Sequence, residues 1–300
     1  MYVFPFLGQY EFIFFRLFGP GIGNSLLIWA RALIYSHRYN LKMVQPTWNN
    51  FSIGPVIRKQ KDLRIYADLF KQDSSYLTNL RKLRLLIFNK KVFEENIIEH
   101  NFKSGDVLIV KGLKNFFNDL CGANDLIYEN ILKITMEKNL QGLNFNYENS
   151  ITLHVRRSDF IGLSADAEST DDQWFVRIVN LLRKKLKKEL KVYIFSDVKN
   201  DQIQNLLSLK NVCRLDHKTS IADLLSMAKS KIFVGSKHST FSHWVSYLGQ
   251  MPTVWPNGCH INKAHGKLLR GNIVETDGFV LDEKFIFECE NSLNSKKNLF

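Results

Sequence analysis

Short apolar runs alternate with segments of helical period between Ser150 and about Thr276. The runs, each of which predicts a strand, are 151–155, 192–195, 212–215, 232–234 and 252–255. The segments with apolar residues at helical spacing are 174–190, 201–209, 221–229 and 241–248. Strands that alternate with helices of about ten residues are typical of βαβ units around a buried parallel sheet. We therefore expect a doubly wound α/β domain in this half of the chain.

The first half of the chain carries a less regular version of the same pattern. The order expected along it is a strand at 12–18, a glycine-rich loop at 19–24, a helix at 25–37, a strand at 41–44, a strand at 106–110 and a mostly helical stretch at 118–139. Asn24 or Ser25 is expected to cap the first helix. The pattern predicts two Rossmann-like α/β domains, residues 1–148 and 149–300, that face a cleft. Ligands in such sheets bind beyond the carboxyl ends of the strands.

Composition narrows the class of protein and bears on its partners. Apolar residues make up 45% of the 300 residues and charged residues 23%, which excludes a disordered chain. The formal net charge is +12, from 41 Lys and Arg against 29 Asp and Glu. A positive charge of this size predicts an anionic partner, which is a nucleotide, a nucleic acid or an acidic membrane surface. Charge alone does not choose among the three.

The cysteines and the N-terminal segment bear on the compartment. Cys121, Cys213, Cys259 and Cys289 lie far apart and form no CxxC pair, so we expect reduced thiols in the cytoplasm and neither disulfides nor a zinc site. The apolar segment 1–18 contains charged residues and is shorter than the roughly 20 residues that a spanning helix needs. We expect no membrane span there, and a peripheral position on the inner face of the membrane stays open.

The glycine-rich loop at 19–24 is the first segment with candidate chemistry. Gly21 and Gly23 bring small residues to the start of the expected helix, where they let a ligand or the facing domain approach the backbone. An ordinary tight turn is the alternative. The loop is not a dinucleotide fingerprint, because Asn24 stands where the third glycine is required.

The segment 154–160, which reads HVRRSDF, follows a buried strand. The guanidinium groups of Arg156 and Arg157, with His154 beside them, suit a pyrophosphate, because each guanidinium grips phosphate oxygens in bidentate fashion. Asp159 would hold one arginine in place or act on a substrate hydroxyl. A surface arginine pair with Asp159 as its salt-bridge partner is the alternative interpretation.

The segment 230–244 runs from a strand through Gly235 and a polar loop into a helix that begins at Ser239 or Thr240. The N–H groups at a helix start, with hydroxyl groups and Lys237 nearby, make a site for an anion. Ordinary N-capping by Ser239 or Thr240 is the alternative.

These three segments, in this order, resemble the motifs of the α-1,2-fucosyltransferases of glycosyltransferase family 11. The segment 154–160 is similar to that family's HxRRGDY/F motif, and the loop 19–25 to its G-G-L-G-N-Q loop. The segment 223–248, with STFS at 239–242 and a tryptophan at 244, is similar to its D-L-x-x-M-S…N-S-S/T-F-S-W-W-G segment. The resemblance covers 12 to about 256. The chain departs from it at Ser158, where the family has glycine, at His243, where tryptophan is common, and at Ser25, where the family has glutamine.

The resemblance implies a two-domain, GT-B-like enzyme that transfers L-fucose from GDP-β-L-fucose to a sugar hydroxyl with inversion. It implies an acceptor-side N-terminal domain and a C-terminal domain that binds the nucleotide sugar. The residues that it assigns to catalysis are His154, Arg157 and Asp159. The residues that it assigns to the donor are Arg156, Arg157, Asp223, Ser239, Thr240, Ser242, Gly21, Gly23 and Asn24.

The departing diphosphate needs a positive counterpart, and many sugar-nucleotide enzymes supply it with a metal held by a D-x-D segment. No convincing D-x-D is present, and 166–168 is only a weak imitation of one. Arg156, Arg157 and a helix start do the same electrostatic work. We therefore predict a metal-independent enzyme with no cofactor and GDP-fucose as its donor substrate. Arg157 is expected to contribute little packing to the folded state, as a strand-end arginine that faces a cleft.

A basic amphipathic helix is expected within 177–191, either as the solvated face of a helix packed on the sheet or as a contact with anionic lipid. Our interpretation is an α-1,2-fucosyltransferase of surface polysaccharide or O-antigen synthesis. Its acceptor would be an oligosaccharide or a lipid-linked saccharide. The alternatives are α-1,6 transfer, another GDP-sugar, and a nucleic-acid-binding protein. No nucleic-acid recognition motif is visible, so we expect no nucleic-acid partner.

Overall fold

The computed structural model describes residues 1–12, 14–51, 65–97, 103–157, 170–259 and 273–295. The chain divides into two compact units, Met1–Glu137 (unit 1) and Lys138–Phe300 (unit 2). We expected the boundary slightly later, between residues 148 and 149. Each unit has its own sheet and its own core, and the two are described in turn.

Unit 2 is built on a six-stranded parallel sheet. Its strands are β8 (Ser150–Val155), β9 (Lys191–Ser196), β10 (Val212–Arg214), β11 (Ile232–Val234), β12 (Thr253–Pro256) and β13 (Ile273–Thr276). They lie in the order β10-β9-β8-β11-β12-β13, and every neighbouring pair is parallel. In chain order within the unit this is 3-2-1-4-5-6, the order of the Rossmann fold. The prediction of a doubly wound α/β domain is confirmed.

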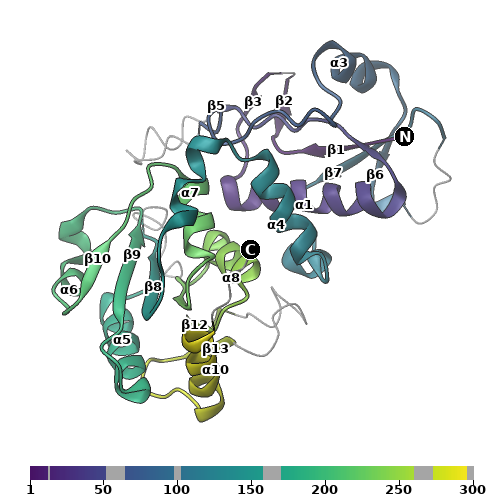
Figure 1. Ribbon diagram of the computed structural model, residues 1–300. Coiled ribbons are helices and arrows are strands. Elements are labelled where there is room, and N and C mark those ends of the chain that lie inside the picture. Colours follow the sequence, from purple (N-terminus) through teal and green to yellow (C-terminus); the bar gives the residue numbers. More distant parts are fainter. Residues whose placement is uncertain (13, 52–64, 98–102, 158–169, 260–272, 296–300) are drawn as a thin grey trace. The chain divides into compact units, whose positions relative to one another are not determined.

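Helices cover the sheet of unit 2, as Figure 1 shows. They are α5 (Asp172–Leu186), α6 (Gln204–Leu207), α7 (Ser220–Met227), α8 (Thr240–Gly249) and α10 (Glu283–Asn294), with 3-10 turns at η4 (Gln141–Asn144) and η5 (Asn200–Ile203). Side chains of a strand alternate between its two faces. Ile151, Leu153 and Val155 of β8 therefore enter the core that contains α5 and α10. His154 points to the opposite face, where it meets α8.

The basic helix expected within 177–191 is α5. Its apolar stripe, which includes Phe175, Ile178 and Leu182, is fully buried in the core of unit 2. Lys184, Lys185, Lys187 and Lys188, within and just after the helix, are exposed. The helix is thus packed on the sheet with a solvated basic face, and its apolar side chains are buried or partly buried against the core.

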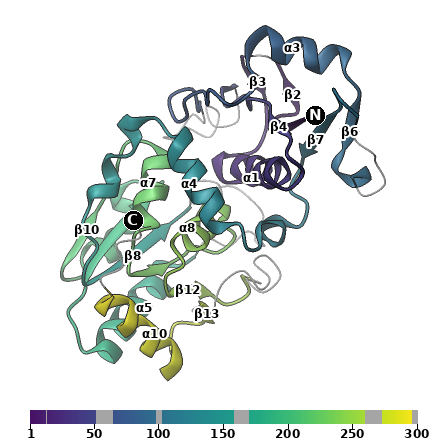
Figure 2. The same cartoon turned by 45° about the vertical axis from the view of Figure 1, so that its right-hand side comes forward.

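Unit 1 carries a smaller parallel sheet. Its order is β4-β1-β7-β6, made of β1 (Tyr2–Phe6), β4 (Lys42–Met43), β6 (Lys91–Phe93) and β7 (Val107–Lys111). The long helix α1 (Ile22–Tyr39) packs against β1, β4 and β7. On the other face, Leu85 of α3 (Asn79–Phe88) packs with Phe4 and Ile109. Figure 2 shows α1 and α3 on opposite sides of the sheet. The unit also contains α4 (Asn124–Ile134) and the 3-10 turns η1 (Glu94–Asn96), η2 (Phe116–Leu120) and η3 (Glu137–Asn139), the last at the boundary.

Two predictions for the start of the chain are wrong. The run 12–18 is not one strand, because β1 lies upstream and the run belongs to a hairpin, β2 (Tyr10–Glu11) and β3 (Arg16–Leu17), which β5 (Asn50–Phe51) extends to a three-stranded sheet. Helix α1 begins earlier than expected, after Gly21, and no side chain caps it. Ser25 is unavailable as a cap because its hydroxyl donates to the carbonyl of Pro20 and accepts from Arg16. Among the described helices, none is both long and apolar enough to cross a bilayer.

Candidate active site

The strand order of unit 2 reverses between β8 and β11. In open α/β sheets, ligands bind outside the carboxyl ends of the strands at such a reversal. His154 lies near the end of β8, and Arg156 and Arg157 follow it. The loop 235–239 follows β11 and leads into α8. The fold therefore brings two motifs that are far apart in the sequence to one edge of the sheet.

Three side chains hold the ends of β8 and β11 together. The hydroxyl of Ser242, in the first turn of α8, lies 2.6 Å from Nδ1 of His154 and accepts the backbone N–H of Ser236 at 3.2 Å. The hydroxyl of Ser236 donates to the carbonyl of His154 at 2.6 Å and accepts the backbone N–H of Arg156 at 2.9 Å. Ser236 thus fixes the backbone on both sides of Val155, at the point where the chain leaves the sheet.

His154 is neutral at physiological pH. Burial is the main reason that its pKa lies well below the usual value, and the positive charge of Arg156 lowers it further against the opposing effect of Asp197. Nδ1 of the imidazole shares a hydrogen bond with Ser242 Oγ, which also accepts the N–H of Ser236. His154 therefore orders the site and can donate a hydrogen bond, but it supplies no positive charge.

The start of α8 is built to receive an anion. Ser239 is the N-cap and accepts the N–H of Ser242 at 3.2 Å, and the first turn holds no acidic residue. Thr240 and Phe241 stand at helix positions whose N–H groups have no intrahelical acceptor. The preceding loop is closely packed, because a Cβ on Gly235 would lie 2.7 Å from the ring of the fully buried Trp255. The N–H groups of Gly235, Ser236 and Lys237 are themselves bonded within unit 2, so this loop acts as a fixed support for the first N–H groups of α8.

Both terminal nitrogens of Arg157 have partners within unit 2. Its Nη2 pairs with the carboxylate of Asp172, and its Nη1 donates to the carbonyl of Gln202 at 2.6 Å. Its backbone N–H donates to Asp197 at 2.9 Å. The expectation of little packing is wrong, because this arginine ties the end of β8 to the first turn of α5. The reason is that successive residues of a strand face opposite sides of the sheet. Arg157 is two residues after Val155, whose side packs on α5, and Arg156 is two residues after His154, whose side meets α8.

Asp172, Asp197 and Ser236 are site residues that the sequence reasoning missed. Asp197 follows β9, the neighbour of β8, so the rule that ligand-side groups follow parallel strands marks it in the sequence as well. Asp172 has no comparable signal, because it is the first residue of α5 and lies 15 residues after Arg157 in the sequence. Among the described residues, no group of three or more His, Cys, Asp or Glu is arranged to hold a metal ion.

The other predicted residues fall in three places. Asp223 lies in the first turn of α7 and accepts the backbone N–H of His217 at 2.9 Å, which fixes the loop after β10. Gly21, Gly23 and Asn24 form the start of α1 in unit 1. Asp159 and its neighbour Ser158 lie outside the described residues, so the proposed role of Asp159 stays a prediction.

A comparison with protein-family models matches residues 70–256 to "Glycosyl transferase family 11". The chain belongs to glycosyl transferase family 11. The match spans the end of β8, the loop after β11 and the start of α8, so the site described above lies within the family's own region. The start of α1 lies outside it. A family 11 member is a glycosyltransferase, which agrees with the class of enzyme expected from the motifs.

Solved structures similar to this family 11 member include two fucosyltransferases. An α-1,6-fucosyltransferase NodZ co-crystallized with GDP is 12% identical with a TM-score of 0.49, and covers 84% of this chain and 92% of its own. The fucosyltransferase NodZ from Bradyrhizobium, as the selenomethionine protein, is 12% identical with a TM-score of 0.48, at the same coverage. POFUT1 in complex with GDP is 13% identical with a TM-score of 0.45, and covers 82% of this chain and 99% of its own. A comparison with curated sequences gives no match.

Proposed function

We propose that this protein transfers L-fucose from GDP-β-L-fucose to a sugar hydroxyl with inversion, forming an α-1,2 linkage. Its place would be the cytoplasm, in the synthesis of a surface polysaccharide or O-antigen, with an oligosaccharide or a lipid-linked saccharide as acceptor. Membership of family 11 supports the glycosyl transfer, and the motif resemblance supports the donor and the linkage.

The observation that carries the proposal is a group of positive donors in unit 2, at the point where the strand order reverses. We call this group, which consists of Arg156 and the first N–H groups of α8, the anion cradle. Glycosyl transfer develops negative charge on the departing diphosphate, and preorganised donors that face this charge lower the barrier. Arg156 continues the face of His154, and the first N–H groups of α8 belong to the same edge of the sheet. Both are positive, and the backbone that presents them is fixed by Ser236 and Gly235.

The residues divide into groups that bind and groups that position. Arg156, Ser239 and Thr240 would contact the diphosphate and the nucleotide. His154 and Ser242 are engaged with each other, so we assign them mainly to holding the cradle in place. Arg157 acts as a positioning residue through Asp172. Asp159 is left as the general base that takes the proton of the acceptor hydroxyl, because Asp172 and Asp197 already hold Arg157.

The motif resemblance assigns the acceptor to unit 1. It also assigns Gly21, Gly23 and Asn24, at the start of α1, to the donor. His243 departs from the family's tryptophan but stacks on Trp255, with ring centroids 4.4 Å apart, so the change falls in the packing behind the site.

Incubation with a panel of GDP-sugars and measurement of released GDP tests the donor. We expect GDP release from GDP-fucose, faster with a galactoside acceptor than in water, and an α-1,2 linkage in the product by NMR. Release from GDP-mannose alone would overturn the donor assignment. An α-1,6 linkage in the product would keep the donor and overturn the linkage.

A further inference from the structure

In the three-stranded β2–β3–β5 sheet of unit 1, polar side chains face inward and aromatic side chains face outward. Glu11 of β2, Arg16 of β3 and Asn50 of β5 point inward, and Arg16 and Asn50 have no accessible surface. The aromatic residues of the same segments point outward, with Phe14 65% exposed. The exposed set is Tyr10, Phe12, Phe14, Phe15, Phe18 and Phe51. A sheet that faces water on one side normally shows the opposite arrangement, with its apolar face inward.

Specific bonds hold this reversal in place. The carboxylate of Glu11 accepts the backbone N–H groups of Leu7 at 2.9 Å and Thr47 at 3.1 Å. Arg16 donates to the carbonyl of Leu7 at 3.0 Å and to the hydroxyl of Ser25 at 3.2 Å. Glu11 and both terminal nitrogens of Arg16 therefore have partners where they are, while Arg16 Nε and the side-chain amide of Asn50 are buried without a hydrogen-bond partner among the described residues. The outward rings are ordered too, since Phe12 and Phe15 stack with centroids 4.7 Å apart.

Helix α3 shows the same arrangement, with a buried lysine and exposed apolar side chains, and its lysine contacts the sheet. Lys82 is 2% exposed and donates to the hydroxyl of Thr47 at 2.7 Å, with Nζ 3.9 Å from Glu11 of β2. Leu80, Ile87 and Phe88 point outward and are 76%, 58% and 78% exposed. Figures 1 and 2 both draw α3 and the β2–β3 hairpin at the same end of unit 1.

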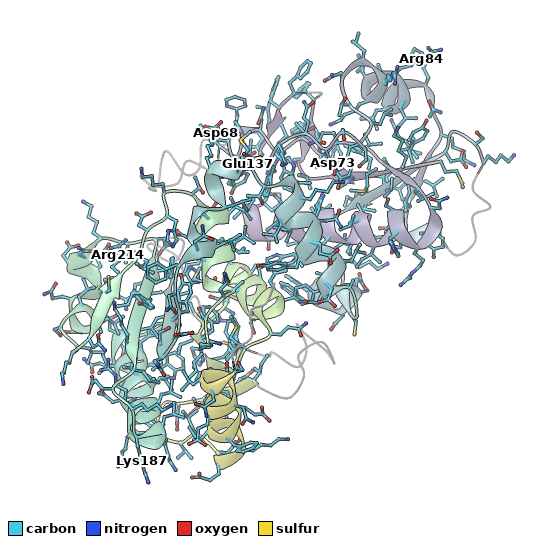
Figure 3. All side chains as sticks on the ribbon, in the orientation of Figure 1. Asp68, Asp73, Arg84, Glu137, Lys187 and Arg214 are labelled. Carbon is cyan, nitrogen blue, oxygen red and sulfur yellow. The ribbon has the colours of Figure 1, made fainter. Side chains whose placement is uncertain are left out.

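The outer side of α3 is basic as well as apolar. Arg81 and Arg84 are exposed beside the apolar side chains, and Figure 3 shows Arg84 projecting away from the unit. Lys90 and Lys91 follow and are exposed. The sequence 79–91 contains no acidic residue. This combination of large apolar side chains with Lys and Arg is typical of a helix that lies in a membrane interface.

We propose that the outer faces of α3 and of the β2–β3–β5 sheet, together called the aromatic–basic surface, rest on a membrane that carries anionic lipid. The aromatic and aliphatic side chains enter the boundary between headgroups and acyl chains. The arginines meet the headgroup phosphates. The surface belongs to unit 1 and uses no residue of the anion cradle, so it stands independently of the proposed function.

Other occupants fit the surface less well. A second copy of the chain in a symmetric dimer would bring the same patch against itself, with Arg81 and Arg84 near their own counterparts and no acidic residue of 79–91 to pair with them. A saccharide would stack on one or two aromatic rings and would leave Leu80, Ile87 and Phe88 of the helix uncovered.

Vesicle sedimentation tests the proposal with the full chain. We expect wild-type protein to bind vesicles of phosphatidylcholine and phosphatidylglycerol more tightly than vesicles of phosphatidylcholine alone. Ile87→Glu with Phe88→Glu should weaken binding to both by at least tenfold, because each side chain would lose its apolar burial. Arg81→Gln with Arg84→Gln should weaken binding to the anionic vesicles alone, by about 25-fold, at about fivefold for each charge. Phe287→Glu on α10, 58% exposed in unit 2, is the matched control and should bind as wild type.

Three outcomes would overturn the proposal. They are wild-type protein that stays in the supernatant, an equal loss in the Phe287 control, and a wild-type dimer that the Ile87 and Phe88 changes dissociate without any vesicle binding. GDP affinity and melting temperature are measured on the same samples and should stay at wild-type values. A failure of GDP binding in wild type would count against the proposed function, and a failure of vesicle binding against the aromatic–basic surface.

Discussion

Arg157→Ala is expected to destabilise unit 2. The substitution leaves the Asp172 carboxylate, whose side chain is only 10% exposed, without its cationic partner. It also removes the bond to the carbonyl of Gln202. Breaking a fully buried ion pair costs about 3–5 kcal/mol, and an exposed pair contributes about 0–1 kcal/mol. The Arg157 side chain is 19% exposed, so we expect an intermediate loss of about 2–3 kcal/mol in the free energy of unfolding.

The loss should depend on pH in a defined direction. Burial raises the pKa of Asp172, and Arg157 lowers it. Without the arginine, the pKa in the folded state rises further above that of the unfolded chain. A carboxyl group shifted upward in this way favours folding at low pH, and that contribution is lost as the pH rises through the folded-state pKa. The deficit of the variant should therefore be larger at pH 7 than at pH 4.5.

Urea unfolding of wild type and variant at the two pH values measures this directly. In a thermal melt at pH 7, the melting temperature of the variant should be lower than that of wild type by roughly 4–12 °C, at about 2–4 °C for each kcal/mol. Arg214→Ala is the control, because this arginine is the last residue of β10 and donates to neutral acceptors on Asn200 and Ser196. Wild-type stability of the Arg157 variant with a large drop in GDP affinity would refute the reasoning and return Arg157 to the diphosphate.

Three further predictions concern the chemistry and its scaffold. GDP release from GDP-fucose should survive excess EDTA, and a loss that Mn²⁺ or Mg²⁺ restores would contradict the metal-independent account. Asp159→Asn should lower turnover by about 10²–10⁴-fold, as for a general base, with GDP affinity by calorimetry nearly unchanged; matched losses of both would make Asp159 structural instead. Gly235→Ala should destabilise by about 1–3 kcal/mol in thermal melts, because the new methyl group meets the buried ring of Trp255; a wild-type melting temperature would show that the loop yields.

The sequence predicts the sheet of unit 2 well, because buried parallel strands appear as continuous apolar runs such as β8 and β11. It fails in the first 24 residues for the opposite reason. There the aromatic residues of the hairpin face outward and the charged residues inward, so composition marks a strand where the chain turns. Which face a residue takes depends on the long-range bonds of Glu11 and Arg16, and no local pattern carries that information.

The candidate site shows the same division. The edge of the sheet that holds His154, Arg156 and Ser242 could be predicted, since each lies at or soon after a strand end. The different roles of Arg156 and Arg157 could not be predicted, because the partner of Arg157 is the first residue of α5, 15 residues further along the sequence. The alternation of side chains along a strand places the two arginines on opposite faces of the sheet, but it does not say which face packs on α5.

Calorimetric titration of GDP into wild type and Arg156→Ala tests the anion cradle most directly. One charge-assisted bond to a phosphate contributes about 1.5–3 kcal/mol, so the variant should bind GDP roughly 10–150-fold more weakly. Its melting temperature should stay at the wild-type value. Lys184→Ala, which removes an equal charge from the solvated face of α5, should leave GDP affinity unchanged. Wild-type GDP affinity in the Arg156 variant would contradict the account, because the diphosphate would then lie away from the ends of β8 and β11.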